Sequence, residues 1–593
     1  MPSSSGCIHL DRERETVEPF ALRRFLRPFR FVLAIAAGLV VADTLLSLVG
    51  PLLVRIGLDD GVLHKEASVV WLASLGFLGA TLVNWAVTYA QARYTGRAAN
   101  RMLLALRVRI FAQLQRLGLD FYEREMAGRI MTRMTTDVEA LSQLLQNGLV
   151  NALVALFSFV GIGAALLVMS WRLGLVALSV IPFLLGATLW YRERSRRVYA
   201  RARERIAVVN ATFQESISGI RTAQAYGQED RNISTFERQA GDYLGARTDA
   251  QRLVATYFPF VTFLSDVAAA AVLGAGVVFA HEGALAPGVV IAFLLYLGQL
   301  FSPISQLSQT FDQWQQANAS MDKIRELMAV PVSTPAPSEP VVPAEIRGEV
   351  RLRRVGFTYP RAPRPALAGV DLVAPPGTTL ALVGPTGAGK STVAKLVARF
   401  YDPTSGVVEL DGIPLTAIDP GTFHARLGYV PQEPFLFAGT VGENIAYGRP
   451  DASRREILAA AQAIGAGELL ERLPGGLDHP VAERGRSLSA GQRQLICLAR
   501  ALLVDPALLI LDEATAALDL ASEARVNRAM GVLADGRTTV LIAHRLPSAA
   551  NARQIAVLLD GRVAELGTHA ELLARDGWYA QAWRSFVPLA ETA

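Results

Sequence analysis

Long apolar stretches dominate the first half of the chain, whereas the second half alternates short apolar runs with polar and glycine-rich segments. Six of the long stretches come near the roughly 20 residues that a helix needs to cross a bilayer. The last of them is interrupted by Pro303. The pattern therefore predicts a helical membrane domain with spans at Phe31–Val54, Val69–Ala90, Leu149–Met169, Leu173–Trp190, Tyr257–Ala280 and Val289–Ile304.

The connections after the second and fourth spans are long, rich in arginine, and keep the apolar spacing of a helix. Because an excess of arginine and lysine marks cytosolic segments, both connections and both termini are expected in the cytosol. The sequence thus predicts a multi-pass protein of the plasma (inner) membrane. Just before the first span, Pro19–Phe29 mixes aromatic residues with arginine, which predicts an amphipathic helix lying at the interface.

A proline-rich stretch, Pro331–Pro343, marks the boundary to the second half. Beyond it, four runs predict strands of a soluble α/β domain. One of them is a continuous apolar run that ends in a carboxylate, which is typical of a buried parallel strand. The predicted strands are 348–352, 379–384, 507–512 and 538–543.

The second of these strands leads into Gly-Pro-Thr-Gly-Ala-Gly-Lys-Ser, residues 384–391. The spacing fits the phosphate-binding P-loop, and the run of helix-forming residues from Lys390 completes the expected strand–loop–helix setting. Glycines let backbone N–H groups converge on phosphate oxygens, Lys390 supplies a positive charge, and Ser391 supplies a hydroxyl ligand for Mg²⁺.

Two further strands end in residues suited to the same chemistry. Asp512 would hold the Mg²⁺ shell, and Glu513 follows it directly, where a carboxylate can polarise an attacking water. His544 follows the strand 538–543 and is expected to contact the γ-phosphate, the alternative being a capped strand end. The predicted activity is hydrolysis of ATP.

Composition adds limits. The chain of 593 residues is 51% hydrophobic and 19% charged, with a net charge of +5. Nearly all of its basic residues are arginines, which reflects codon usage as readily as a polyanionic partner, so no nucleic-acid partner is inferred. Cys7 and Cys497 are its two cysteines, too few for a disulfide framework or a cysteine-ligated metal cluster, and Cys497 is expected to be a buried core residue.

With the P-loop, the string Leu488–Gln492 (called the signature below), the Asp512-Glu513 pair and His544 in this order, the second half resembles the nucleotide-binding domain of ABC transporters. The whole chain resembles an ABC half-transporter with the six-helix, exporter-type membrane domain. The resemblance implies a cytosolic tail and interfacial helix (1–30), a membrane domain (31–328), a linker (329–347), a nucleotide-binding domain (348–586) and a tail (587–593).

The resemblance also implies ATP and Mg²⁺ as cofactors. Tyr359 would stack on adenine, and Gln432 would sense the metal and the attacking water. Ser489 and Gly491 would clamp the γ-phosphate held by an opposite subunit, while Asp519 would link the two sites. The implied nucleotide contacts are Tyr359, Gly384, Pro385, Thr386, Gly387, Ala388, Gly389, Lys390, Ser391, Thr392, Ser489, Gly491, Gln492 and Asp519; the implied metal contacts are Ser391, Gln432 and Asp512, and the implied catalytic residues are Glu513, His544 and Gln432.

The cytosolic coupling turns of the membrane domain would fall near 121–123 and 219–229. Three positions depart from the family's usual residues. The signature has Ala490 in place of glycine, the stretch before it has Ala482 in place of glycine, and Arg129 stands where an acidic residue is common.

One P-loop and one signature occur, so the functional unit is expected to be a dimer, and Ala490 favours a heterodimer over a homodimer. The leading hypothesis is a subunit of an ATP-driven exporter of a lipid, drug or other amphipathic compound that works by alternating access. The alternatives are an importer on the same fold and an ATP-gated channel or regulator. The apolar spans exclude a soluble ATPase that acts on nucleic acid.

Two carboxylates fall near the middle of predicted spans, Asp43 in the first and Asp266 in the fifth. A carboxylate at bilayer depth is costly and usually faces a cavity or a partner. Each is therefore a candidate for the substrate path or for proton contact, the alternative being a structural hydrogen bond to a neighbouring helix.

Overall fold

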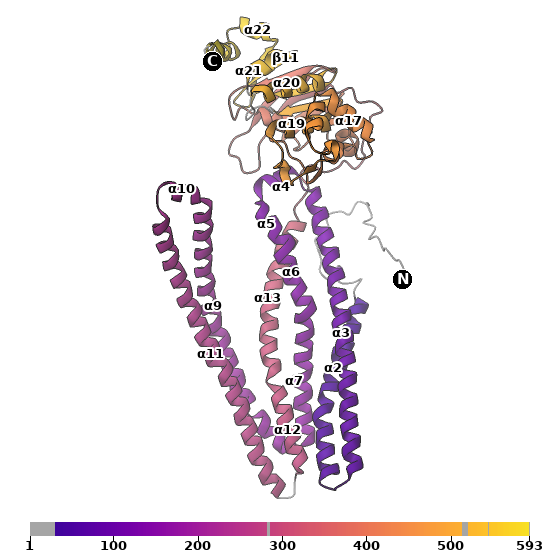
Figure 1. Cartoon of the computed structure of the whole chain (residues 1–593), viewed down its shortest axis with the longest axis vertical. Coiled ribbons are helices and arrows are strands. Elements are labelled where there is room, and N and C mark those ends of the chain that lie inside the picture. Colours follow the sequence, from indigo (N-terminus) through magenta and orange to yellow (C-terminus); the bar gives the residue numbers. More distant parts are fainter. Residues whose placement is uncertain (1–29, 282–284, 513–519, 544, 592–593) are drawn as a thin grey trace. The chain divides into compact units, whose positions relative to one another are not determined.

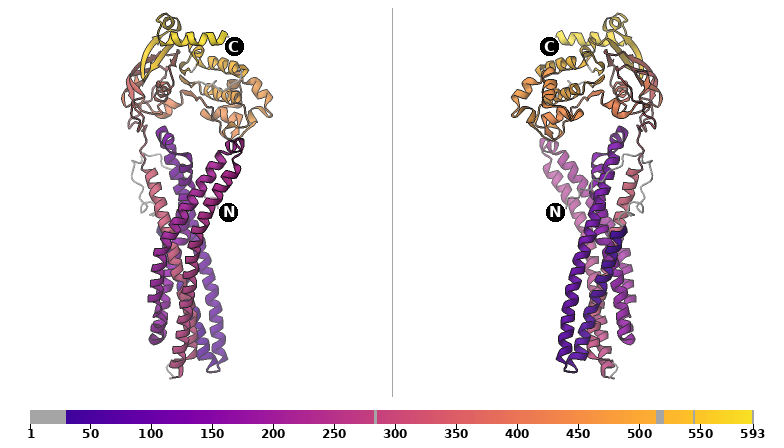
Figure 2. Two further views of the ribbon diagram at one scale, coloured as in Figure 1. Left: turned by 90° about the vertical axis from the view of Figure 1, so that its left-hand side faces the viewer. Right: turned by 90° about the vertical axis from the view of Figure 1, so that its right-hand side faces the viewer.

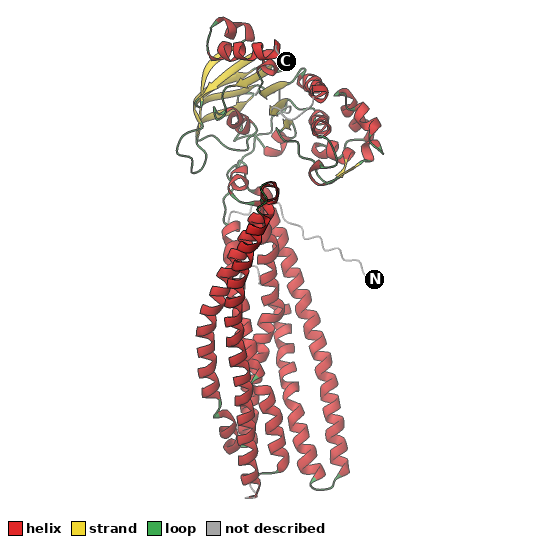
Figure 3. Cartoon of the chain, turned by 60° about the vertical axis from the view of Figure 1, so that its left-hand side comes forward, coloured by secondary structure: helices red, strands yellow, loops and turns green. Residues whose placement is uncertain are grey.

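The computed structural model describes residues 30–281, 285–512, 520–543 and 545–591. The chain divides into two compact units. The first comprises Met1–Gln113 and Gly128–Ala329, and the second comprises Leu114–Ala127 and Val330–Ala593. Figure 3 shows that the first unit is built from helices and that the second holds the strands. The predicted tail and interfacial helix before Arg30 lie outside the described residues.

The first unit consists mainly of long helices joined by short connections. Its elements are α2 (Arg30–Ile56), the π-helical turn η2 (Gly57–Val62), α3 (Ala67–Arg116), α5 (Ala127–Thr132), the π-helical η3 (Arg133–Asp137), α6 (Val138–Gln143), the π-helical η4 (Leu144–Gly148), α7 (Leu149–Met169), α8 (Trp171–Leu178), α9 (Ile181–Ser218), α10 (Ile220–Ala225), α11 (Glu229–His281), α12 (Pro287–Leu300) and α13 (Ser302–Met328).

The predicted helical membrane domain is confirmed, with a difference at two spans. Five helical segments of the described chain are long and apolar enough to cross a membrane, and α12 is a shorter apolar helix. The predicted span 289–304 is shared between α12 and α13, because Pro303 in the first turn of α13 cannot continue the preceding helix. Pro182 similarly lies in the first turn of α9, so the predicted span 173–190 is interrupted between α8 and α9.

The connection predicted to stay helical after the fourth span does so. Helices α9 and α11 lie side by side, with the short α10 between them (Figure 1). In both views of Figure 2 the α9–α11 pair crosses the other long helices of this unit at an angle and diverges from them toward one end. Their buried core gathers Leu166 of α7, Leu173 of α8, Tyr257 of α11, and Phe293 and Tyr296 of α12.

Apolar side chains also cover the outside of this unit. Trp71 and Leu72 on α3, Val168 on α7 and Trp171 on α8 are each 63–87% exposed. Water would make so many exposed large apolar groups unfavourable, whereas hydrocarbon tails would not. The surface therefore suits a bilayer.

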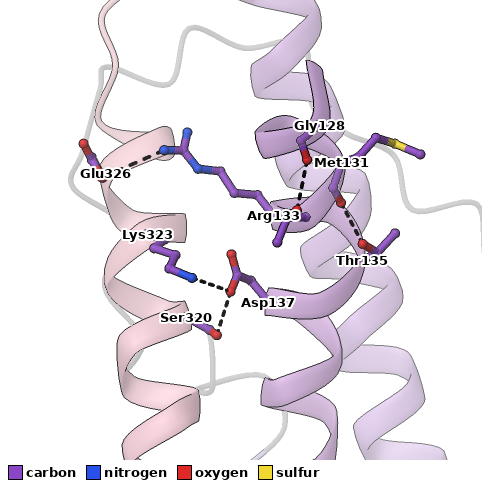
Figure 4. Close-up of polar contacts among 9 residues, drawn as sticks. Gly128, Met131, Arg133, Thr135, Asp137, Ser320, Lys323 and Glu326 are labelled. Atoms are coloured by element: carbon purple, nitrogen blue, oxygen red, sulfur yellow. Dashed lines mark hydrogen bonds and ion pairs between the residues drawn. The ribbon is translucent and has the colours of Figure 1, made fainter. Parts of the chain in front are cut away.

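A polar cluster, buried on the η3 side, joins η3 to α13 (Figure 4). The Asp137 side chain is 4% exposed, and its Oδ1 accepts hydrogen bonds from Ser320 Oγ at 2.9 Å and from Lys323 Nζ at 3.1 Å. One turn away, Arg133 Nη2 lies 4.0 Å from Glu326 Oε2. The cluster therefore fastens a π-helical segment, which is an intrinsically irregular piece of helix, to the end of the last long helix.

Replacing Asp137 with alanine is expected to lower the stability of the helical unit by about 2 kcal/mol. The loss stays below that of a fully buried pair because the Lys323 side chain is 53% exposed and can rehydrate. The loss of stability is measured as a lower Tm in thermal unfolding of the detergent-solubilised protein, monitored by tryptophan fluorescence. Glu326→Ala is the control, since this partner is 75% exposed and should change Tm little. Equal Tm values for Asp137→Ala and wild type would contradict a stabilising role.

The second unit contains two larger sheets. A four-stranded antiparallel sheet has the order β2-β1-β4-β5, and a six-stranded sheet has the order β12-β11-β3-β10-β9-β6, parallel except for β12. The strands are β1 (Val350–Phe357), β2 (Leu367–Ala374), β3 (Thr379–Val383), β4 (Ser405–Leu410), β5 (Ile413–Pro414), β6 (Leu427–Val430), β7 (Gly439–Thr440), β8 (Pro480–Val481), β9 (Leu508–Asp512), β10 (Thr538–Ile542), β11 (Gln554–Leu559) and β12 (Arg562–Gly567).

The helices of this unit pack around three hydrophobic cores. They are α4 (Leu119–Arg124), α14 (Lys390–Val397), α15 (Pro420–His424), α16 (Val441–Ile445), α17 (Arg454–Ala463), α18 (Gly467–Arg472), α19 (Ala490–Leu503), α20 (Leu520–Ala534), α21 (Leu546–Ala550), α22 (His569–Ala574) and α23 (Trp578–Glu591). Helix α14 packs with β1, β2 and β4 in one core, and α19 packs with α16, α17 and α20 in a second. The third core holds α21, α22 and α23. Cys497 is buried in the second core, as expected.

Candidate functional site

The carboxyl ends of four neighbouring strands bring the predicted site residues to one edge of the six-stranded sheet. Leu382 of β3 pairs with Ile542 of β10, which in turn pairs with Asp512 of β9. On the far side of β9, Val430 of β6 pairs with Leu511. The P-loop, Gln432 and Asp512 therefore follow at the same level, at the edge where α/β sheets bind ligands.

The P-loop takes a conformation that depends on its glycines. Gly384 and Gly389 have φ of 144° and 104°, and Gly389 forms the N-terminal cap of α14. A Cβ at Gly384 would lie 2.2 Å from the Leu558 carbonyl oxygen, and one at Gly389 would lie 2.9 Å from that of Ala366. Glycines with positive φ at the start of a helix let successive backbone N–H groups point toward one bound anion.

Lys390 is the buried cation of this loop. It is 5% exposed, and its Nζ donates hydrogen bonds to the carbonyl oxygens of Gly384 at 2.8 Å and of Pro385 at 2.9 Å. These bonds hold the ammonium over the loop. Thr386, Gly387 and Ser391 are exposed beside it, whereas Ala388 is buried and anchors the loop to the core.

Of the residues predicted to lie near the metal and the attacking water, the structure describes some and leaves out others. Asp512 is half-buried at the end of β9, and Gln432 is exposed after β6. Burial, followed by the neighbouring Asp512 carboxylate, raises the pKa of Tyr429. The predicted residues Glu513, Asp519 and His544 lie outside the described part of the chain.

Tyr359 lies beside the P-loop helix. Its hydroxyl lies 3.1 Å from Thr392 Oγ1, and its ring meets the rings of Phe357 and Tyr401 edge to face at 4.8 and 5.5 Å. Lys395 Nζ lies over the same ring, 5.5 Å from its centroid. An aromatic ring held next to a phosphate-binding loop can stack on a nucleobase.

The signature forms the N-terminus of α19. Ser489 Oγ accepts a hydrogen bond from the Gln492 backbone N–H, and Gln492 Oε1 accepts one from the Ser489 N–H, which makes a complete capping box. Ala490 is the first helical residue and does not have a positive φ, so the backbone accepts alanine without strain. A small cavity of about 110 Å³ lies here, lined in part by Gln492, Arg472 and Arg525.

The signature and the P-loop of this chain belong to different cores. Leu488 and Leu495 pack in the core around α19, while Ala388 and Val393 pack in the core around α14. Gly491 and Lys390 are thus held on separate parts of the unit. The arrangement suits a signature that serves another subunit's P-loop.

Supporting residues that the sequence pattern did not indicate hold these loops. Arg493 donates a hydrogen bond to the carbonyl oxygen of Leu488, the first residue of the signature, at 2.7 Å. Arg500 donates to the Phe435 carbonyl at 3.1 Å and to the side chain of Asn444 at 3.0 Å, which fixes the chain just beyond Gln432. Both arginines lie on α19, and only their helical spacing of seven residues could have suggested a shared face.

The residues fit a nucleotide with a metal that is held mainly by the nucleotide. Among the residues described, no cluster of three or more His, Cys, Asp or Glu side chains could hold a metal ion alone. Mg²⁺ usually takes one or two protein oxygens plus phosphate oxygens and water. Ser391 and Asp512, beside a glycine cradle and a buried lysine, match that requirement.

In the helical unit, Asp43 takes part in a link between helices. Its Oδ1 accepts hydrogen bonds from Thr88 Oγ1 at 2.7 Å and from Asn84 Nδ2 at 3.2 Å, both on α3. This is the structural hydrogen bond considered as the alternative to substrate contact. Asp266 is exposed on α11 and, within the described residues, makes neither a hydrogen bond nor an ion pair.

Comparison with known proteins agrees with this geometry. Residues 33–304 match the family model described as the ABC transporter transmembrane region, and residues 367–516 match the model described as ABC transporter. The chain is 34% identical over 561 residues to the uncharacterized ABC transporter ATP-binding protein YknV of Bacillus subtilis, covering 94% of this chain and 93% of that protein. The chain belongs to the ABC transporter family.

Two further similarities are informative. The chain is 42% identical over 571 residues to the multidrug efflux ATP-binding/permease protein Rv0194 of Mycobacterium tuberculosis, covering 96% of this chain and 48% of that protein. The chain therefore spans about half the length of that relative. A solved structure of a bacterial Atm1-family ABC exporter with ATP bound matches with a TM-score of 0.78 and 28% identity, covering 94% of this chain and 99% of that one. The fold is that of an ABC exporter.

Proposed function

We propose that this chain is one subunit of an ATP-hydrolysing membrane exporter. The observation that carries the proposal is the sheet edge at which the P-loop, Gln432 and Asp512 meet, in a chain that also contains a unit with a lipid-compatible surface. Lys390 and the loop N–H groups would bind the β- and γ-phosphates, and Tyr359 would stack on adenine. Ser391, Asp512 and Gln432 would hold Mg²⁺.

The residues outside the described chain complete the proposed chemistry. Glu513 follows Asp512 and would accept a proton from the attacking water, while His544 would contact the γ-phosphate. A bound Mg²⁺ neutralises charge that develops on the phosphates. Asp519 would connect the two sites of a dimer.

The proposed functional unit is a dimer. The separate cores of P-loop and signature support it, because Ser489, Gly491 and Gln492 can then clamp a nucleotide held by the partner's P-loop. Ala490 favours a heterodimer in which the partner supplies the less crowded signature. The Mycobacterium relative is about twice as long as the matched segment, as a protein with two such halves on one chain would be.

The proposed cargo is a lipid, drug or other amphipathic compound, moved outward across the inner membrane with the nucleotide-binding unit in the cytosol. Two cavities of the helical unit favour such a cargo. One, of about 510 Å³, is lined by aromatic residues that include Phe183 and Trp190, and the other, of about 320 Å³, is lined by apolar residues together with Asn84 and Gln299. Apolar walls with few polar groups suit amphipathic ligands.

Transport into inside-out vesicles from the native host tests the proposal. ATP should drive accumulation of a fluorescent amphipathic dye such as Hoechst 33342 or of a labelled phospholipid, and vanadate should stop it. Vesicles from cells that carry Lys390→Met on this chain serve as the control. ATP-driven loss of the probe from the vesicles would favour import, and ATP-gated ion currents without transport would favour a channel; either result would overturn the proposed direction or activity.

A further inference from the structure

The short helix α4 is fastened to the P-loop helix through one carboxylate. Along the chain α4 connects α3 to α5, yet it forms part of the same compact unit as the nucleotide site. Glu123 Oε1 accepts a hydrogen bond from Lys395 Nζ at 2.7 Å, and Glu123 Oε2 accepts one from the Tyr401 hydroxyl at 2.6 Å. Both oxygens of the carboxylate are therefore used by residues on or just after α14.

In this contact Glu123 and Lys395 form an ion pair, and the Tyr401 phenol donates a second hydrogen bond to the carboxylate. Although burial raises the pKa of Glu123, hydrogen bonds from Lys395 and Tyr401 outweigh it, and the net pKa is lowered. Burial lowers the pKa of Lys395, but the bond to Glu123 raises it above the ordinary value. Burial and the bond to Glu123 raise the pKa of Tyr401. All three groups thus keep the protonation states that the contact needs at neutral pH.

The same two partners of Glu123 also contact the ring of Tyr359. Lys395 Nζ lies 5.5 Å from the Tyr359 ring centroid, so one ammonium bridges the carboxylate on α4 and the face of this ring. The Tyr401 ring meets the Tyr359 ring edge to face at 5.5 Å. Removing the carboxylate would release both Lys395 and Tyr401 from their present positions.

We propose that Glu123 is a positioning residue for adenine: through Lys395 and Tyr401 it holds the Tyr359 ring ready for stacking, and it thereby couples base binding to the docking of α4. This inference rests on the proposed role of Tyr359. The coupling is reciprocal, because a base that favours the held ring must equally favour a docked α4. The proposal therefore predicts that binding of the phosphates by the P-loop depends less on Glu123 than binding of adenine does.

The discriminating measurement compares ATP with inorganic tripolyphosphate, which carries the phosphates without a base. The full-length protein in nanodiscs is titrated with each, in competition with a fluorescent nucleotide. Glu123→Gln keeps the size of the side chain, and it is expected to weaken ATP binding about fivefold to tenfold while changing tripolyphosphate binding less than about twofold. Lys395→Met should give the same pattern.

Matched controls separate this inference from the role of Tyr359 itself. Tyr359→Ala should lower the preference for ATP over tripolyphosphate at least as much, and adding Glu123→Gln to it should cause little further loss. Asp120→Asn, on the same helix but paired with Arg124 and Ser333, should leave the preference unchanged. Thermal unfolding of each variant verifies that the fold is intact.

Three results would overturn the inference. If Tyr359→Ala lowers the ATP preference and Glu123→Gln does not, the positioning role is wrong while the adenine role of Tyr359 stands. If Glu123→Gln weakens both ligands equally, the carboxylate is only a structural anchor for α4. If Tyr359→Ala leaves the preference unchanged, the proposed adenine site itself is wrong.

Discussion

Replacing Glu513 with glutamine is expected to lower the steady-state ATPase rate of the reconstituted protein about 100-fold or more while leaving ATP binding intact. Glu513 directly follows Asp512 at the end of β9, the strand next to the one that leads to His544. An amide keeps the size of the side chain but cannot take a proton from water. The ATPase rate is measured as phosphate release by the protein reconstituted in lipid, and the retained affinity for ATP is measured by equilibrium binding.

The matched control is Glu471→Gln, an exposed carboxylate on α18 away from the sheet edge. It should leave the rate within about twofold of wild type, since isolated surface charges contribute little. The ATP-loaded Glu513→Gln protein should also accumulate as a long-lived dimer. A turnover rate near that of wild type in Glu513→Gln would refute the assignment of the general base.

Replacing Lys390 with methionine is expected to weaken ATP binding about 100-fold or more. The side chain is buried over the P-loop and donates to two loop carbonyls, so its loss removes both a positive charge and the bonds that shape the loop. Methionine has a similar length and suits the apolar surroundings, so the domain should still fold. Photolabelling with an azido-ATP measures binding to this chain directly.

Ser391→Ala is the neighbouring control for Lys390→Met. It removes only a hydroxyl, and it should weaken binding of Mg·ATP while leaving ATP binding in EDTA unchanged. Strong labelling of Lys390→Met at wild-type ATP concentrations would show that the loop does not hold the phosphates through this lysine.

Periodicity and spacing predicted much of this architecture because they reflect strong local constraints. Strand β3, the P-loop and α14 follow from a motif in which each glycine meets a backbone requirement, because a Cβ at Gly384 or Gly389 would clash with a backbone carbonyl oxygen. The apolar run 507–512 predicted β9 because a strand covered on both faces must be apolar throughout. The interruption at Pro303 was predicted, whereas the break at Pro182 was not, since proline can either kink or interrupt a membrane helix.

Contacts between distant segments could not be predicted in this way. Glu123 and Lys395 are 272 residues apart in sequence, and Asp137 and Lys323 are 186 apart. Each is one charged residue among many on a helix, and only tertiary structure selects its partner. The capping role of Ser489 was likewise not predicted. Ser489 and Gln492 have the spacing of a capping box, but both were interpreted as part of the signature.

The length of α11 has a mechanical consequence. Its 53 residues make a rod about 80 Å long, so a tilt of about 10° at one end moves the other end by roughly 14 Å. Pro259 lies within this rod and leaves the carbonyl of Ala255 without its usual helical donor, which makes that turn easier to bend. A displacement at the α10 end would thus move the far end of a rigid α11, whereas bending at the Pro259 turn, beside Tyr257 in the packed helical core, would absorb part of it.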